Sequence, residues 1–321
     1  MKSPVSVRFA TLACASIIGL CLDHSDAQVV VVDEVAMRPL VAADAKVEKL
    51  ADGMKFIEGP VWLGKGEAGR LIFSDIPANE LKEWSPEGGL KIFRTPSNNT
   101  NGNTLDLEGR LVSAEHSARR VSRTESDGTV VTVVDRVDGK RFNSPNDVVV
   151  KSDGTFWFTD PPYGLPRDQP KELDGHFVFR HDPKNGQTTK VSAQHDMPNG
   201  LAFSPDEKRL YVADSGRPRH ILVYDVREDG TLSEGKVFCT IDKGGPDGIR
   251  VDAAGNIWSS AGDGVQIFDP SGRLVGRILC PESPANLAFG GPDGKWLFMT
   301  SRTSLYRVLV AIGPSRRPAA R

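Results

Sequence analysis

One pattern recurs six times along this 321-residue chain, at intervals of roughly 40–50 residues. Each copy holds an alternating apolar strand, a turn, and a second apolar strand. In five of the six copies the first residue carries a side-chain oxygen. A repeat of this length indicates an array of similar small sheets. The copies read EGPVW at 58–62, NGNTL at 101–105, NDVVV at 146–150, NGLAF at 199–203, DGIRV at 247–251 and ANLAF at 285–289.

Each repeat predicts four antiparallel strands. In the third copy, VVV at 148–150 leads through a DG turn to FWF at 156–158, and both segments follow the period of a strand. A second SG turn at 271–272 shows where the third and fourth strands of a later copy meet. The third repeat is lengthened by residues 161–170, which are too rich in proline for a central strand.

The chain is therefore predicted to be all-β: a six-bladed β-propeller with four-stranded antiparallel blades around a central metal site. Residues 46–56 are expected to supply the outer strand of the last blade and so close the ring. The absence of helical periods between strands argues against an α/β barrel. A β-sandwich is the alternative, but it gives no reason for an oxygen ligand to recur at one strand position.

The bulk composition fits one globular domain over residues 28–312, followed by a basic tail at 313–321. Hydrophobic residues make up 39% of the chain and charged residues 26%, which is ordinary for a folded protein. The net charge of -2 offers no broad basic face for nucleic acid.

Residues 1–27 have the pattern of a cleaved signal peptide. Lys2 and Arg8 precede an uncharged run, and small residues stand before the expected cleavage site at Ala27. This predicts a periplasmic or secreted protein with no membrane attachment after cleavage. An N-terminal membrane helix or a buried helix is the alternative. A lipoprotein leader is disfavoured because Leu20 precedes Cys21 where a small residue is needed.

Removal of the leader would leave Cys239 and Cys280 as the remaining cysteines. In an oxidising compartment they could form a disulfide. They could equally be two buried thiols that pack as small apolar residues.

Four of the repeated positions form a candidate cation site, because ring closure would bring the starts of the inner strands to one axis. Glu58, Asn146, Asn199 and Asp247 would offer two carboxylates and two amide oxygens, which suits Ca²⁺. Zn²⁺, Mg²⁺ and Mn²⁺ remain alternatives, although zinc favours His and Cys ligands. Each residue taken alone could simply start a turn. Ala285 breaks the series, so the sixth position is not expected to be a ligand.

Further polar residues are expected near the same end of the axis as substrate-binding candidates. Asn103 stands where the sister repeats carry apolar residues, which suggests a substrate contact, with a buried core amide as the alternative. His116 could be an acid–base group, a substrate ligand or a structural histidine. Arg141 could bind a hydroxyl-rich or anionic ligand, and Tyr163 could line the entrance. The candidates are Asn101, Asn103, His116, Arg141 and Tyr163.

At these residues the chain resembles the senescence marker protein/gluconolactonase family of calcium-dependent six-bladed propellers, in its bacterial gluconolactonase branch. The resemblance implies a divalent metal held by the four residues above and hydrolysis of aldonolactones, with Asp247 activating water. The sequence departs from the family at Asn103 and at Ser117, where a glycine commonly follows the histidine. The matching segments are EGPVW at 58–62, RFNSPNDV at 141–148, TDPPYG at 159–164, PNGLAFSPD at 198–206, PDGI at 246–249 and NLAFGG at 286–291.

The expected function is that of a metal-dependent hydrolase that opens sugar lactones, with a small-molecule sugar lactone as partner and a monomeric or dimeric state. Two alternatives stay open. The same site could cleave phosphotriesters or aryl esters, or the propeller could be a calcium-stabilised module that binds a sugar or a protein without catalysis.

Overall fold

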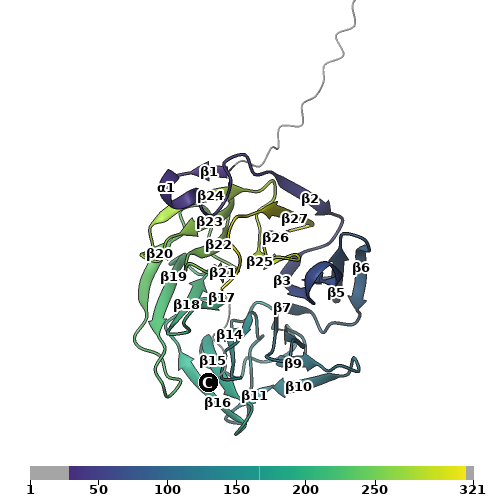
Figure 1. Ribbon diagram of the computed structural model, residues 1–321. Helices are drawn as coiled ribbons and strands as arrows, with labels where there is room; N and C mark the ends of the chain where they lie inside the picture. The colour runs from purple at the N-terminus through teal and green to yellow at the C-terminus, as the bar shows by residue number, and fades with distance from the viewer. Residues whose placement is uncertain (1–28, 166, 316–321) are drawn as a thin grey trace, which may run out of the picture.

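The computed structural model describes residues 29–165 and 167–315 of the chain. Six antiparallel sheets follow one another around a central axis, as Figure 1 shows, with the first strand of each sheet nearest the axis. Each innermost strand contacts the next one around the ring, and the last, β25 (Asn286–Gly290), contacts the first, β3 (Ile57–Leu63). The predicted six-bladed propeller is confirmed.

Blades 1 to 3 each hold four strands in simple up-and-down order. Blade 1 contains β3, β4 (Arg70–Asp75), β5 (Glu80–Ser85) and β6 (Gly89–Arg94); blade 2 contains β7 (Thr100–Leu105), β8 (Leu111–Glu115), β9 (Arg120–Thr124) and β10 (Val130–Val134); blade 3 contains β13 (Val148–Val150), β14 (Phe156–Asp160), β15 (Phe177–Asp182) and β16 (Gln187–Ser192). A short hairpin of β11 (Arg136–Val137) and β12 (Lys140–Arg141) links blades 2 and 3.

Blades 4 to 6 repeat this plan. Blade 4 contains β17 (Pro198–Phe203), β18 (Arg209–Asp214), β19 (His220–Asp225) and β20 (Lys236–Thr240); blade 5 contains β21 (Ile249–Val251), β22 (Ile257–Ala261), β23 (Gly264–Phe268) and β24 (Leu274–Leu279); blade 6 contains β25, β26 (Trp296–Ser301), β27 (Ser304–Leu309) and β2 (Val47–Ala51).

The ring is closed by a strand from the N-terminal part of the chain. Strand β2 pairs antiparallel with β27, with Val47 opposite Val308, so blade 6 combines both ends of the domain. This confirms the expectation for residues 46–56, and it removes the free edge that the last blade would otherwise present.

Two N-terminal elements were not predicted. Strand β1 (Val29–Val31) adds a fifth strand to blade 5 by pairing with β24, and a one-turn helix, α1 (Glu34–Met37), follows it. At the other end, the backbone N–H of Ser315 donates to the Val251 carbonyl at 3.0 Å, so the tail begins by lying along blade 5. The predicted signal peptide and residues 316–321 lie outside the described residues.

Apolar side chains fill the spaces between neighbouring blades. Phe142, in the link between blades 2 and 3, packs edge-on against Phe158 of blade 3, with ring centroids 5.0 Å apart, and Trp258 of blade 5 packs in the same way on Phe289 of blade 6. Burial of a side chain of this size stabilises the fold by about 1.5–3 kcal/mol. Within the described ranges, no helix is both long and apolar enough to cross a bilayer.

Both cysteines of the domain are free. Cys239 is buried on β20 and Cys280 is partly buried just after β24. Burial raises the pKa of the Cys239 thiol to about 12, which makes it a poor nucleophile. The sequence left open whether Cys239 and Cys280 form a disulfide or stay as two thiols, and in the structure they are two thiols.

Glycines follow four of the repeated polar positions because the blades converge there. A Cβ atom on Gly59 would lie 2.0 Å from the Asn101 carbonyl oxygen, and one on Gly200 would lie 2.4 Å from the Asp247 carbonyl oxygen. Backbone hydrogen bonds join the same positions across blades; the Gly200 N–H donates to Asp247 at 3.1 Å. This close approach brings the first residues of the inner strands to the axis.

Candidate functional site

A cavity of about 510 Å³ opens at the end of the axis where the inner strands begin. Apolar side chains of Phe56 and Ile76 form part of its wall. The cavity brings together seven of the residues that the sequence singled out. They are the four candidate ligands Glu58, Asn146, Asn199 and Asp247 and three of the substrate-binding candidates, Asn101, His116 and Tyr163.

Three asparagine side chains from neighbouring blades form a continuous row across the floor of this cavity. The Asn101 amide donates to Asn146 Oδ1, the Asn146 amide donates to Asn199 Oδ1 at 2.5 Å, and the Asn199 amide donates to Ser215 Oγ at 2.9 Å. Rotation of an amide group by half a turn exchanges its oxygen and its nitrogen. The same positions can therefore present oxygens to a cation or N–H groups to a substrate.

Of the two carboxylates of the site, Glu58 is buried and Asp247 is half-buried. Burial raises the pKa of Glu58 to about 7. The hydrogen bond that the Gly59 N–H donates to this carboxylate at 2.5 Å acts in the opposite direction and lowers the pKa. Burial also raises the pKa of Asp247 well above its usual value, and the negative charge of Glu58 raises it further. The two groups are thus close enough to repel one another, and a bound cation would relieve this repulsion.

This donor set fits a hard divalent cation. Glu58 and Asp247 would supply carboxylate oxygens, and Asn146 and Asn199 would supply amide oxygens, which Ca²⁺ accepts readily. In the part of the chain that the structure describes, no three His, Cys, Asp or Glu side chains gather as a metal cluster. A cation here would therefore depend on the amides, which favours Ca²⁺ over Zn²⁺.

His116 lies beside the row of amides. Its Nε2 atom is 3.3 Å from Asn146 Oδ1 and 3.4 Å from the Asn101 amide nitrogen. Burial lowers the pKa of His116 to about 4, so the imidazole is neutral near pH 7. A neutral imidazole can donate or accept a hydrogen bond without adding positive charge next to a cation.

The insertion of blade 3 covers this histidine. Tyr163 and Gly164 line the cavity, and Ser144 holds them in place from below. The Ser144 hydroxyl donates to the Pro161 carbonyl at 2.6 Å and accepts a hydrogen bond from the Gly164 N–H at 3.0 Å. The proline-rich segment therefore contributes a wall of the cavity.

Asn103 lies outside this cavity. Its amide donates to the Gly59 carbonyl at 2.9 Å and to Ser74 Oγ at 3.0 Å, while its oxygen accepts from Ser113 at 2.8 Å. The position faces the contact between blades 1 and 2, as its apolar counterparts do in other blades. These bonds fit the alternative of a core amide whose hydrogen bonds are satisfied within the protein.

Arg141 is also placed away from the cavity. Its guanidinium donates to the Ala118 carbonyl at 3.0 Å and to Gln169 Oε1 at 3.2 Å, and its backbone N–H donates to Glu172 at 2.7 Å. The arginine holds the base of the blade 3 insertion, so the structure does not support the predicted contact with a ligand.

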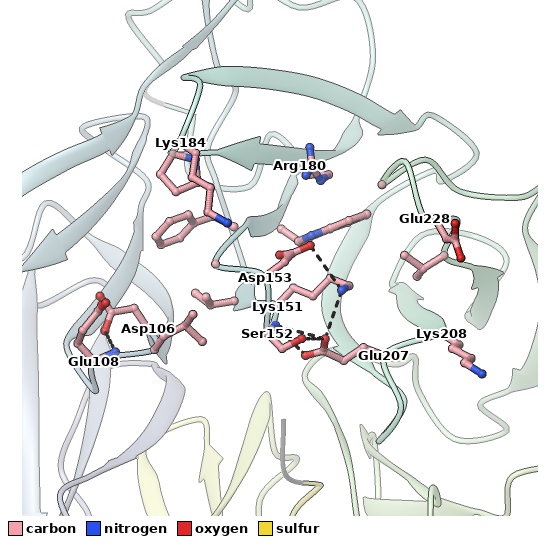
Figure 2. A pocket seen from close by; sticks show the side chains of 18 of the residues that line it. Asp106, Glu108, Lys151, Ser152, Asp153, Arg180, Lys184, Glu207, Lys208 and Glu228 are labelled. Atoms are coloured by element: carbon pink, nitrogen blue, oxygen red, sulfur yellow. Dashed lines mark hydrogen bonds and ion pairs between the residues drawn. The ribbon is translucent and has the colours of Figure 1, made fainter. Parts of the chain in front are cut away.

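A larger cavity, of about 720 Å³, lies among the turns at the other ends of the strands of blades 2 to 4. Figure 2 shows Lys151 between two carboxylates there, 3.5 Å from Asp153 and 3.3 Å from Glu207. None of the residues predicted from the sequence lines it. Arg110 and Lys151 form ion pairs with carboxylates that line the same cavity. The cavity with the amide row, which holds the predicted residues, is therefore the candidate site.

Sequence reasoning missed Asp147 and Arg250, which lie just below the amide row. Their side chains form a partly buried ion pair, with Arg250 Nη1 3.6 Å from Asp147 Oδ2 and the Arg250 side chain 20% exposed. A signal was present, because Asp147 occupies the place that is glycine in four of the other repeats.

Comparison with known proteins identifies the family of the chain. The SMP-30/Gluconolactonase/LRE-like region matches residues 56–303. A gluconolactonase of Zymomonas mobilis is 34% identical over 293 residues, covering 82% of this chain and 80% of the relative. A 6-deoxy-6-sulfogluconolactonase of Pseudomonas putida is 36% identical over 252 residues, covering 76% and 82% respectively. A solved gluconolactonase of Xanthomonas campestris, 34% identical, matches 89% of this chain and 96% of its own with a TM-score of 0.82. The chain therefore belongs to the SMP-30/gluconolactonase family.

Proposed function

We propose that this protein is a lactonase that hydrolyses the ring ester of sugar lactones, with a divalent cation, Ca²⁺ first among them, bound at the propeller axis. The observation that carries this proposal is the pair of carboxylates, the buried Glu58 and the half-buried Asp247, that line one cavity with a row of amides. Relatives at 34% and 36% identity that are named for sugar lactones support the choice of substrate class.

Glu58, Asn146, Asn199 and Asp247 would hold the cation, which when bound would supply a Lewis acid for the ester carbonyl. Asp247 accepts a proton as water attacks the carbonyl carbon. The bond from that carbon to the ring oxygen then breaks, and the ring oxygen takes a proton to become the hydroxyl of the sugar acid. Burial favours Asp247 in this role because it raises the proton affinity of the carboxylate.

The neighbouring residues bind and orient the lactone. Asn101 and the neutral His116 offer hydrogen bonds to sugar hydroxyls from blade 2. Tyr163 and Gly164 cover the other side and limit the access of bulk water. We further propose that the predicted leader sends the protein to the periplasm or outside the cell, and that it acts there as a monomer or dimer.

The test is acid release from a panel of five- and six-carbon sugar lactones, measured beside an aryl ester and a phosphotriester. A lactonase should accelerate the opening of at least one lactone above its spontaneous rate and prefer it to the other two substrates. Preference for the aryl ester or phosphotriester would redirect the assignment to that class, and activity on none would refute it.

A further inference from the structure

A second layer of side chains fills the axis directly beneath the candidate ligands. The residue after each repeated position is glycine in four blades, but it is Asp147 in blade 3 and Asn286 in blade 6. A Cβ atom on Gly102 would lie 2.5 Å from Asp147 Oδ1, and one on Gly248 would lie 2.1 Å from the Asn286 side chain. The glycines therefore leave the space that these two side chains occupy.

Asp147 is a buried carboxylate. Its Oδ1 atom accepts a hydrogen bond from the Val148 N–H at 2.9 Å, and the Leu201 N–H and the Arg250 side chain also interact with the carboxylate. The cation that faces it is Arg250, whose Nη1 lies 3.6 Å from Oδ2 and donates to the Ile249 carbonyl at 2.7 Å. A buried charge at this distance from its partner is expensive as a purely structural element.

The layer acts electrostatically on the ligands above it. The negative charge of Asp147 acts on both Glu58 and Asp247. Arg250 and a hydrogen bond from Asn286 act in the opposite direction on Glu58. The charges of Asp147 and Arg250 therefore act directly on the carboxylates of the cation site above them.

We propose that Asp147 and Arg250 set the charge of the cation site. With Glu58 and Asp247 ionised, three carboxylates and one guanidinium on the axis carry a formal charge of two negative, which one divalent cation balances. The inference deepens the proposed function and rests on its cation site. Asp147 and Arg250 are positioning residues, because they act through the ligands and do not line the cavity above them.

If this proposal is right, neutralising Asp147 and neutralising Arg250 should change the Ca²⁺ affinity in opposite directions. Asp147→Asn removes a negative charge and should weaken Ca²⁺ binding about tenfold or more while leaving the metal-free protein as stable as wild type or more so. Arg250→Met leaves three carboxylates uncompensated. It should lower the melting temperature of the metal-free protein, tighten Ca²⁺ binding and enlarge the rise in melting temperature on adding Ca²⁺.

The experiment is calorimetric titration of the metal-free protein with Ca²⁺, together with melting curves with and without the ion. Arg250→Lys keeps the charge and should bind Ca²⁺ much as wild type does. Arg136→Met, which removes an exposed arginine on β11, is the matched control and should change nothing. If Arg250→Met does not fold without metal, the double variant Asp147→Asn/Arg250→Met replaces it. The double variant restores the formal charge and should return the affinity from the Asp147→Asn value towards that of wild type.

The outcomes separate the two proposals. Variants that bind Ca²⁺ with the wild-type affinity, or that shift it in the same direction, would overturn the charge-setting role and leave the cation site standing. Binding of Ca²⁺ without turnover of any lactone would overturn the lactonase assignment but not the charge-setting role of Asp147 and Arg250. A wild-type protein that binds no Ca²⁺, Mg²⁺, Mn²⁺ or Zn²⁺ would overturn both.

Discussion

Gly164 packs against the imidazole ring of His116 so closely that a Cβ atom at Gly164 would lie 2.1 Å from Cγ and Nδ1 of the ring. The insertion of blade 3 and the edge of blade 2 therefore fit together only through a glycine. This contact fixes the histidine relative to the amide row, and it makes the width of the cavity depend on the position of the insertion.

Substitution Gly164→Ala should displace either the insertion or the His116 ring. We expect kcat/KM for the lactone to fall about tenfold to a hundredfold, because displacement by roughly 1 Å is enough for such a loss. Gly245→Ala is a suitable control, since a Cβ there meets nothing closer than 3.7 Å. Equal kinetics in the two variants would show that the contact with His116 does not matter.

Ser144 should be needed to hold the insertion. Loss of its hydroxyl in Ser144→Ala removes the bonds to Pro161 and Gly164 and should cost about 0.5–1.5 kcal/mol of the free energy of unfolding. We expect KM to rise more than kcat falls, because the wall that covers the substrate becomes loose. Steady-state kinetics and urea unfolding measure both effects. An unchanged KM would contradict the role of the insertion in substrate binding.

The two carboxylates of the cation site should behave differently on substitution. Asp247→Ala should abolish turnover, because it removes both a cation ligand and the proposed proton acceptor. Glu58→Gln keeps an oxygen at the site but removes a charge, so it should weaken Ca²⁺ binding and leave turnover at saturating Ca²⁺. Full activity of Asp247→Ala would refute the role given to that residue.

Acid should destabilise the protein partly through His195. Burial lowers the pKa of this histidine to about 4, and its Nε2 lies 3.2 Å from the Tyr224 hydroxyl. Between pH 6.5 and pH 4 the unfolded chain binds a proton here that the folded protein does not. Stability is therefore lost as the pH falls through this window, by at most about 1.4 kcal/mol per pH unit. Unfolding of His195→Gln at several pH values should show a shallower slope, and an identical slope would contradict this assignment.

Much of the fold could be predicted because the repeats can be aligned with one another, strand by strand, from their sequences. The period-two segments fixed which residue begins each inner strand, and this register placed Glu58 and Asp247 on one axis although they are far apart in the chain. Strand β1 was not predictable in this way, because three valines without a turn signal do not reveal that their partner is β24.

Two of the substrate-binding candidates lie away from the cavity for physical reasons. The strand pattern predicts that Asn103 faces the axis, but the strand is irregular between Thr100 and Asn103, and the side chain faces the neighbouring blade. Arg141 is close to the candidate ligands in sequence, yet its long side chain reaches the insertion instead. The direction of a side chain after a bulge, and the target of a long flexible one, depend on tertiary contacts that spacing does not encode.

The most direct test of the account is a titration of chelator-treated protein with Ca²⁺ while the opening of glucono-1,5-lactone is followed by acid release. We predict no acceleration without the cation and a rise in rate that levels off at one ion per chain, with the plateau lost in Asp247→Ala. A rate that is the same before and after chelation, or that never exceeds spontaneous opening at any Ca²⁺ concentration, would contradict the proposal of a cation-dependent lactonase.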